Sequence, residues 1–266
     1  MLSSPLVSVI IPTYNSENFI RLTLESVLSQ SYQNIEIIIV DDNSSDSTLD
    51  IIKDISEDNP KIKYYSLPVN TGTPAAPRNY GVSMSKGEFI AFIDSDDLWH
   101  PEKIVLQLSL MCIHSCEASS TNCVNFSSSP PQNHSYSSPV PFKKITLFSQ
   151  LLKYQTPTSS LMLHRSLAIK FPFPEDFFLR GREDLVQSLN MHSAINNSFK
   201  LKLDLVYYRV HSSQISSNKI IMLLKVFYIL AFHITPALNI YKILFPFFIL
   251  SNTFLSLYLR IIRKKL

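Results

Sequence analysis

The sequence predicts an α/β fold built on a mostly parallel sheet flanked by helices, and three observations lead to this class. Short apolar, β-branched segments alternate with amphipathic segments over the first hundred residues, which is the order that crossover connections between parallel strands require. Three of the four apolar segments run directly into polar or acidic loops. The chain has 266 residues, 45% of them hydrophobic and 17% charged, so it is long enough to bury a core and unlike a disordered chain.

The elements of the first hundred residues follow from the local pattern. Strands are expected where short apolar runs stand between turn residues, at 6–11, 35–40, 62–67 and 89–93. Helices are expected where apolar residues recur at helical spacing, at 17–31, 48–56 and 78–85. Asp46 is expected to cap the second of these helices.

The middle of the chain is less regular. Residues 115–144 are rich in Ser, Pro and Asn and are expected to be irregular. Around them the same criteria predict helices at 101–114, 145–153 and 183–193, and strands at 158–164 and 203–209.

The C-terminal tail differs from the rest in composition. Residues 243–259 carry no charge, and Arg260, Arg263, Lys264 and Lys265 follow them. As a helix this segment would be ~26 Å long, against a hydrocarbon core of ~30 Å. It would therefore lie at a membrane surface, span the membrane once, or pack on the domain. We favour the first, with the basic end on an anionic cytoplasmic leaflet.

Charge and cysteine content exclude other classes. A net charge of +3 is too small to argue for nucleic-acid binding. The chain has three cysteines, an odd number, and all lie in one stretch: Cys112, Cys116 and Cys123. This favours reduced thiols over a disulfide framework. A zinc site with His114 is disfavoured, because no second ligand pair follows at the right spacing. No secretory signal peptide is expected.

Carboxylates follow the predicted strands at two places and open a predicted helix at a third. Asp94 and Asp96 project to the same side in extended geometry, and such hard oxygen ligands hold Mg²⁺ or Mn²⁺ beside a diphosphate. Asp42 ends another strand and can accept hydrogen bonds from a nucleobase or ribose. Glu183 and Asp184 open a helix, where the helix dipole favours acidic residues, but a carboxylate there also suits a general base for a sugar hydroxyl.

Several motifs occur together in one order along residues 6–103. They are the segments 7–15, 36–48, 77–81 and 86–99, followed by Glu183-Asp184 and by 208–211. With these motifs the chain resembles the family 2 glycosyltransferases of the GT-A fold. One departure is Pro77, which has no N–H to donate to a diphosphate.

The resemblance implies roles on the nucleoside side of the site. Pro12, Thr13 and Tyr14 would line the pocket for uracil. Asp42 would hold the nucleoside.

It also implies residues for the diphosphate, the sugar and a metal ion. Arg78 and Asn79 would lie near the donor diphosphate or sugar. Asp94 would contact the ribose or sugar, and Asp96 would ligate Mn²⁺ or Mg²⁺ with help from His211.

The implied reaction is inverting transfer, with Asp184 as the base and Glu183 supporting it or contacting the acceptor. A hexose, galactose or glucose, would pass from a UDP-sugar to a polyprenyl-diphosphate-linked saccharide in surface polysaccharide (O-antigen-like) biosynthesis. Residues 1–218 would form the GT-A domain, divided into a nucleotide-sugar half at 1–103 and an acceptor half at 104–218. Residues 219–266 would hold the protein peripherally on the cytoplasmic face of the inner membrane.

Three alternatives remain at this stage. The chain would be a catalytically inactive, membrane-associated binding protein on the same fold, or a transferase with another nucleotide-sugar and a protein or soluble acceptor. A sugar-1-phosphate nucleotidyltransferase is disfavoured, because it needs a glycine-rich, basic phosphate loop. Residues 12–16 contain neither glycine nor a cation.

Overall fold

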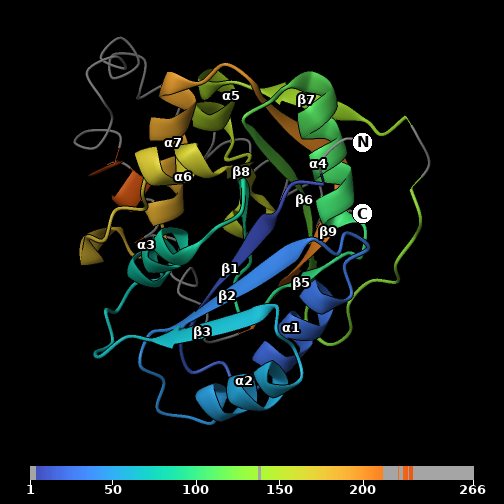
Figure 1. The fold of residues 1–266 in the computed structure, drawn as a ribbon. Coiled ribbons are helices and arrows are strands. Elements are labelled where there is room, and N and C mark those ends of the chain that lie inside the picture. The colour runs from blue at the N-terminus through green and yellow to red at the C-terminus, as the bar shows by residue number, and fades with distance from the viewer. Residues whose placement is uncertain (1–3, 137–138, 212–220, 222–223, 227, 230–266) are drawn as a thin grey trace, which may run out of the picture.

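The computed structural model describes residues 4–136, 139–211, 221, 224–226 and 228–229. These residues form a mixed sheet with helices on both faces (Figure 1). The strands are β1 (Val7–Thr13), β2 (Ile35–Asp41), β3 (Ile62–Ser66), β4 (Phe89–Phe92), β5 (Leu98–Trp99), β6 (Ala118–Phe126), β7 (Phe142–Ile145), β8 (Met162–His164) and β9 (Ser198–Arg209).

The helices fall into two groups about this sheet. The α-helices are α1 (Ile20–Leu28), α2 (Thr48–Glu57), α3 (Ala75–Met84), α4 (Lys103–His114), α5 (Leu147–Leu152), α6 (Arg165–Lys170) and α7 (Glu183–Ala194). Two 3₁₀ turns, η1 (Thr158–Ser160) and η2 (Phe177–Leu179), precede β8 and α7. In Figure 1, α1, α2 and α4 cover one face of the sheet, and α3, α6 and α7 cover the other.

The first half of the sheet is parallel, as the sequence predicts. Its strand order is β3-β2-β1-β4, and every neighbouring pair runs in the same direction. Both faces of β1 are buried: Val9 and Ile11 pack into one apolar cluster, and Ile10 packs into the other. This two-sided burial explains why the strand is a continuous apolar run rather than an alternating one.

The second half of the sheet is mixed, which the prediction of a mostly parallel sheet did not include. The order continues β8-β6-β9-β5, with β7 beside β9. Strand β8 is antiparallel to β4 and β6, whereas β6 and β9 are parallel. The parallel half therefore carries the loops at the carboxyl ends of β1, β2 and β4, and the mixed half closes the sheet beside them.

The expectation that residues 115–144 are irregular is wrong for two parts of that segment. Residues 118–126 form β6, and residues 142–144 belong to β7. The polar side chains of β6 are buried because buried partners satisfy them: Gln107 donates to the Ser119 hydroxyl at 3.0 Å, and the Ser120 hydroxyl donates to the Gln155 carbonyl at 3.1 Å. Composition alone could not distinguish such a strand from a loop.

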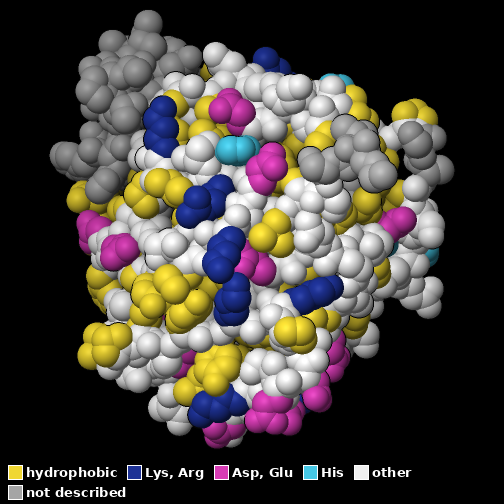
Figure 2. Space-filling view, in the orientation of Figure 1, with side chains coloured by type: hydrophobic (Ala, Val, Ile, Leu, Met, Phe, Trp, Pro, Cys, Tyr) yellow, Lys and Arg dark blue, Asp and Glu magenta, His cyan; other side chains and the backbone are white. Residues whose placement is uncertain are grey.

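Three smaller expectations concern the Asp46 cap, the cysteines and the distribution of surface charge. The Asp46 carboxylate accepts from the Thr48 N–H at 3.0 Å and so satisfies one donor of the first turn, but the cap position itself is Ser47, one residue later than expected. The three cysteines are unpaired. The face in Figure 2 carries acidic and basic side chains interspersed rather than a continuous basic surface, in keeping with the small net charge.

The predicted tail, residues 219–266, lies largely outside the described residues. Only residues 221, 224–226 and 228–229 of it are described, and Ile229 among them is buried against Leu185, Val186 and Leu189 of α7. Within the described part of the chain, no helix has the length and apolar character needed to cross a bilayer.

Candidate active site

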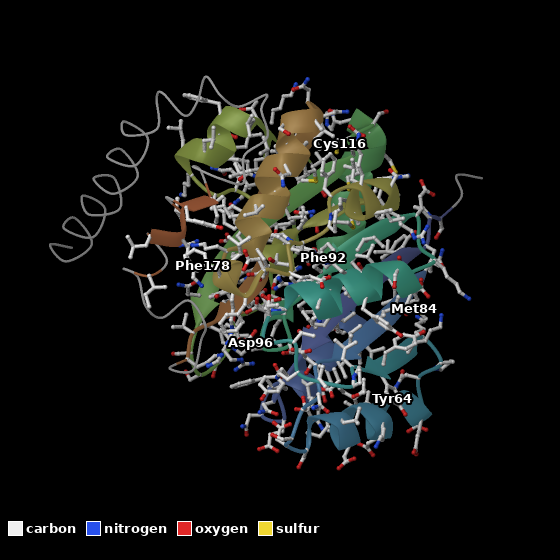
Figure 3. The ribbon with its side chains drawn as sticks, turned by 90° about the vertical axis from the view of Figure 1, so that its left-hand side faces the viewer. Tyr64, Met84, Phe92, Asp96, Cys116 and Phe178 are labelled. Atoms are coloured by element: carbon white, nitrogen blue, oxygen red, sulfur yellow. The ribbon has the colours of Figure 1, made fainter. Side chains whose placement is uncertain are left out.

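One cavity of about 850 Å³ opens at the carboxyl ends of β1, β2 and β4. Ligands bind at this edge in sheets of this type. The loops after these strands line one part of the cavity, and residues 154–159 with the start of α7 line the other. Figure 3 labels Asp96 and, further toward the left-hand margin of the view, the exposed Phe178.

The end of β1 supplies the first wall of the cavity. Pro12, Thr13 and Tyr14 all line it, as the sequence predicts for a nucleoside pocket. The Thr13 side chain is buried, and its hydroxyl has no hydrogen-bond partner among the described residues. The Tyr14 ring is 46% exposed, so it is accessible to a ligand base.

The end of β2 supplies a buried carboxylate. Asp42 is 4% exposed, and its two oxygens accept from the N–H and the hydroxyl of Thr71 at 2.9 and 3.0 Å. The next residue, Asn43, has φ +61°, an unusual backbone conformation for a residue with a side chain. The loops after β1 and β2 are also joined, because the Asn15 side chain accepts from the Ser45 N–H at 2.9 Å.

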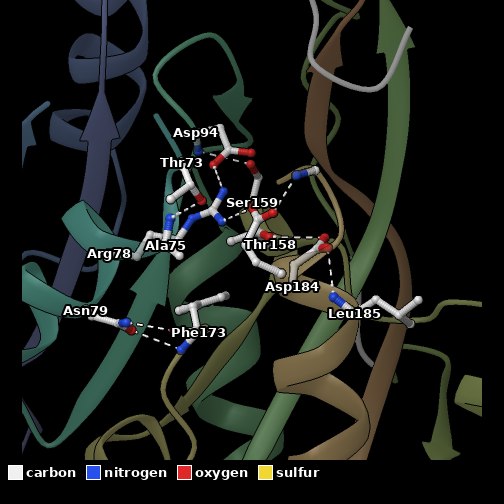
Figure 4. Close-up of polar contacts among 12 residues, drawn as sticks. Thr73, Ala75, Arg78, Asn79, Asp94, Thr158, Ser159, Phe173, Asp184 and Leu185 are labelled. Atoms are coloured by element: carbon white, nitrogen blue, oxygen red, sulfur yellow. Dashed lines mark hydrogen bonds and ion pairs between the residues drawn. The ribbon is translucent and has the colours of Figure 1, made fainter. Parts of the chain in front are cut away.

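Arg78 of α3 connects the two sides of the cavity (Figure 4). Its guanidinium is buried, and its Nη2 lies 2.7 Å from Asp94 Oδ1, a contact that Figure 4 shows. Its Nη1 lies 2.8 Å from Glu183 Oε1. Burial lowers the pKa of Arg78, but the charges of Asp94 and Glu183 outweigh that effect and raise its pKa overall. The Gly181 N–H donates to the other Glu183 oxygen at 2.6 Å. Glu183 is therefore held on both of its oxygens.

The loop after β4 carries three aspartates with different surroundings. Asp96 Oδ2 lies 2.9 Å from His211 Nε2, and both side chains line the cavity. Burial raises the pKa of Asp96, the charge of Asp94 raises it further, and the bond to His211 opposes the rise. Asp97 is fully buried and accepts from the Ser159 hydroxyl at 2.5 Å and the Arg209 N–H at 3.0 Å. Asp97 thus joins this loop to η1 and β9.

Asp184 lies in the first turn of α7, in the wall of the cavity. Its Oδ2 accepts from the Tyr154 hydroxyl at 2.8 Å and the Thr158 hydroxyl at 3.4 Å, and its Oδ1 accepts from the Leu185 N–H at 2.8 Å. Burial raises the pKa of Asp184 to about 6, and the charge of Glu183 contributes to the rise. A carboxylate with a pKa near the working pH is suited to proton transfer.

Most of the predicted site residues line this cavity, but Asn79 does not. The Asn79 amide donates to the Phe173 carbonyl at 2.8 Å and to Glu175 at 2.8 Å, and it accepts from the Phe173 N–H at 3.0 Å. Figure 4 shows this pair away from Asp184. Sequence reasoning missed Tyr154, because its meeting with Asp184 depends on how the second half of the chain folds.

The loops after β1, β2 and β4, the pair Asp94 and Asp96, and the two carboxylates that open α7 thus line one cavity. The family model for glycosyl transferase family 2 matches residues 8–171. The chain belongs to this family, and it is a glycosyltransferase.

Similar proteins from bacteria support this assignment. The chain is 34% identical over 224 residues to WfaP of Escherichia coli, UDP-Glc:alpha-D-GlcNAc-diphosphoundecaprenol beta-1,3-glucosyltransferase, covering 80% of this chain and 81% of WfaP. It is 32% identical over 216 residues to TuaG of Bacillus subtilis, a putative teichuronic acid biosynthesis glycosyltransferase, covering 81% and 83% of the two chains. Against an uncharacterized glycosyltransferase of Haemophilus influenzae, 42% identity extends over 41% of this chain and 44% of the relative.

A solved structure has the same fold. S. aureus TarS (residues 1–349), in complex with UDP-GlcNAc, superimposes with a TM-score of 0.68 and 26% identity. The superposition covers 84% of this chain and 66% of the TarS chain, so this chain spans about two thirds of that protein fragment.

Proposed function

We propose that this protein transfers a hexose from a UDP-sugar to a polyprenyl-diphosphate-linked saccharide in the biosynthesis of a surface polysaccharide. Two relatives with this donor and acceptor in their names, WfaP and WfgD of Escherichia coli, each align over 80% of the chain. Both names specify glucose, so glucose is the first candidate and galactose is the second. The structural neighbour TarS, solved with UDP-GlcNAc, supports a UDP donor.

One observation carries this proposal: a single cavity contains the buried Thr13 and Asp42, the pair Asp96–His211 and the perturbed carboxylate Asp184. Thr13 and Asp42 suit a nucleoside, and the pair Asp96–His211 suits a diphosphate with its counter-ion. Asp184 lies across the cavity from them, at the far end of the Arg78 bridge. A donor and an acceptor would thus meet between the two sides.

The chemistry we assign to Asp184 is general base catalysis. Its carboxylate would take the proton from the acceptor hydroxyl as that oxygen attacks the anomeric carbon of the donor. Tyr154 and Thr158 would hold the carboxylate in place through their hydroxyl donors. A single displacement of this kind inverts the anomeric centre. A retaining double displacement would need a carboxylate nucleophile close to the sugar, and Asp94 and Glu183 are both engaged with Arg78.

The donor atoms at Asp96 and His211 fit a divalent metal ion. The Asp96 carboxylate supplies the oxygen ligand that Mn²⁺ or Mg²⁺ prefers, and the His211 imidazole lies 2.9 Å from it, so both could face one ion. Among the described residues no group of three His, Cys, Asp or Glu side chains is arranged to hold an ion, so the diphosphate and water would complete the coordination. When bound, such an ion stabilises the negative charge of the leaving nucleoside diphosphate.

A lipid-linked acceptor implies that the enzyme works at a membrane. We propose a peripheral protein at the cytoplasmic face of the cell membrane, with residues 219–266 as the part that contacts it. The acceptors in the names of WfaP and WfgD support this location. Comparing the membrane fractions of full-length protein and a 1–218 truncation tests it. Equal distribution of the two would contradict the role of the tail.

The function is tested by a donor screen. Purified protein with Mn²⁺ is incubated with a GlcNAc-diphosphate-lipid analogue and each of UDP-Glc, UDP-Gal, UDP-GlcNAc and UDP-GalNAc, and products are read by mass. We expect one added hexose, with glucose the best donor, and loss of product in Asp184→Asn. Binding of UDP without transfer from any donor would favour a different acceptor or the inactive binding protein. Absence of UDP binding would exclude a UDP-sugar transferase.

A further inference from the structure

Two arginines on the segment before α7 have no role in the mechanism above. Arg180 and Arg182 flank Gly181, whose φ of +80° allows the sharp turn between η2 and α7. Both side chains line the cavity. Their Nε atoms are buried without a hydrogen-bond partner, and neither guanidinium forms an ion pair within the part of the chain that the structure describes.

Arg180 and Arg182 differ from Arg78 in that no carboxylate pairs with their guanidinium groups among the described residues. Arg78 lies between two carboxylates, so its charge is already compensated. Lys225 adds to the positive charge around Arg180, because its ammonium donates to the Arg180 carbonyl at 2.7 Å. We name Arg180, Arg182 and Lys225 the basic cluster. These cations form no ion pair among the described residues, although Glu183 and Asp184 lie near them. A partly buried group of this kind in a cavity is suited to an anion, and arginine binds phosphate oxygens in a bidentate manner.

The anion has to lie on the acceptor side. The basic cluster precedes Asp184 directly in the chain, and the positive charge of Arg182 is close enough to lower the pKa of Asp184. The pair Asp96–His211, which suits the donor diphosphate, lies instead on the loops after β4 and β9. The proposed donor ligands and the basic cluster thus come from different segments of the chain, and Phe177 lies between them, beside Gly72 of the loop that holds Asp42.

Two exposed aromatic side chains lie just before the basic cluster. Phe177 and Phe178 of η2 are 65% and 50% exposed, and Figure 3 shows Phe178 at the outside of the molecule. Phe177 also lies 6.0 Å from the Arg180 guanidinium. Along the chain the order is therefore apolar rings, cations, then the carboxylate Asp184. A lipid-linked acceptor has the matching order of isoprenoid chain, diphosphate and sugar hydroxyl.

We propose that Arg180 and Arg182 bind the diphosphate of the lipid-linked acceptor, with Phe177 and Phe178 against the first isoprene units. This assignment rests on the proposed function and adds the residues that recognise the acceptor. It makes the segment 177–184 a continuous acceptor site. The diphosphate would position the sugar so that its hydroxyl reaches Asp184.

The test compares three acceptors that carry the same lipid chain: GlcNAc-diphosphate, GlcNAc-monophosphate and a neutral GlcNAc glycoside. For the wild type we expect the lowest KM with the diphosphate. Arg182→Gln should raise that KM about 10-fold or more, the effect of losing a charge-assisted hydrogen bond, and Arg180→Gln should act in the same direction. KM for the neutral glycoside and the affinity for UDP should change less than about 2-fold. The control is Arg21→Gln, an exposed arginine paired with Asp54, which should match the wild type.

Phe177→Ser provides a second readout. In the wild type, we expect an acceptor with a long isoprenoid chain to have a lower KM than one with a short alkyl chain. In Phe177→Ser the two KM values should be equal, and the affinity for UDP should be unchanged.

Distinct results would overturn the assignment. If Arg182→Gln lowers the affinity for UDP as much as it raises the KM for the acceptor, the basic cluster binds the donor diphosphate instead. An equal rise of KM for all three acceptors would give it a structural role. If the wild type transfers to the neutral glycoside as well as to the diphosphate, the acceptor anion is not recognised. If it transfers to none of the three, the proposed function itself fails.

Discussion

The guanidinium of Arg78 donates a 2.8 Å hydrogen bond to the carboxylate of Glu183, a residue 105 positions further along the chain. Both side chains are 4% exposed, so neither charge is compensated by bulk water. This ion pair connects α3, in the first hundred residues, to the start of α7, in the second half of the chain. The position of Asp184 relative to the donor loops therefore depends on it.

Replacing Arg78 should destabilise the fold. Arg78→Met leaves Glu183 buried without its partner, and breaking a buried pair in this way costs about 3–5 kcal/mol of unfolding free energy. Urea denaturation followed by circular dichroism measures the loss. Arg21→Gln removes only the exposed pair with Asp54 and should cost less than about 1 kcal/mol. Equal stability of the two variants would contradict the bridging role.

Asp184→Asn should abolish transfer while preserving the protein. The amide keeps the shape of the side chain but cannot accept the proton, so we expect kcat to fall about 10²- to 10⁴-fold. UDP affinity, measured by calorimetry, should stay within about 2-fold of the wild type, since Asp184 is on the acceptor side. Residual activity near the wild-type level would exclude Asp184 as the base.

The pH profile should follow the titration of Asp184. Burial raises its pKa to about 6, and the base is active only when deprotonated. The rate kcat/KM should therefore be low below pH 6, rise through about pH 6 and level off above it. The Tyr154 hydroxyl donates to this carboxylate and lowers its pKa, so Tyr154→Phe should move the rising limb to higher pH. If the pH at the midpoint of this rise is the same in Tyr154→Phe and the wild type, Tyr154 does not influence the pKa of the base.

Metal removal should stop the reaction. Treatment with EDTA should reduce transfer to background, and Mn²⁺ should restore it. Asp96→Asn should raise the Mn²⁺ concentration for half-maximal rate by at least about 10-fold, an effect of the size that even indirect changes to metal sites produce. Transfer that continues at full rate in EDTA would rule out the metal-dependent mechanism.

Asn79 provides a test between two assignments. The family resemblance implies contact with the donor diphosphate or sugar, whereas the amide is engaged by Phe173 and Glu175. We expect Asn79→Ala to cost about 1–3 kcal/mol of stability through unsatisfied backbone groups and to leave the KM for the UDP-sugar unchanged. A rise in that KM without loss of stability would restore the donor role.

The sequence predicted the parallel part of the sheet more fully than the mixed part, for a physical reason. In β1, β2 and β4 each strand is buried on both faces, so local hydrophobicity alone marks it. Strand β6 instead depends on Gln107 and Gln155, which satisfy its buried hydroxyls from elsewhere in the fold. Interactions of that kind leave no local pattern.

The same distinction applies to the site. Asp42, Asp94 and Asp96 follow strands β2 and β4 and were recognisable from their position and motifs. Tyr154 comes from a segment without a motif and meets Asp184 only after α5 and α7 pack together. Asp97 belongs to the recognisable motif, but its burial against Ser159 and the Arg209 backbone is visible only in the fold.

The buried carboxylate of Asp97 has a consequence for binding. It anchors the loop next to Asp96 and the strand end two residues before His211. If Asp96 and His211 hold an ion as proposed, bringing them together on binding would otherwise cost conformational entropy, and the apparent affinity would fall with the fraction of competent molecules. The contacts of Asp97 fix both segments when the chain folds. The proposed site would therefore be preorganised before each catalytic cycle.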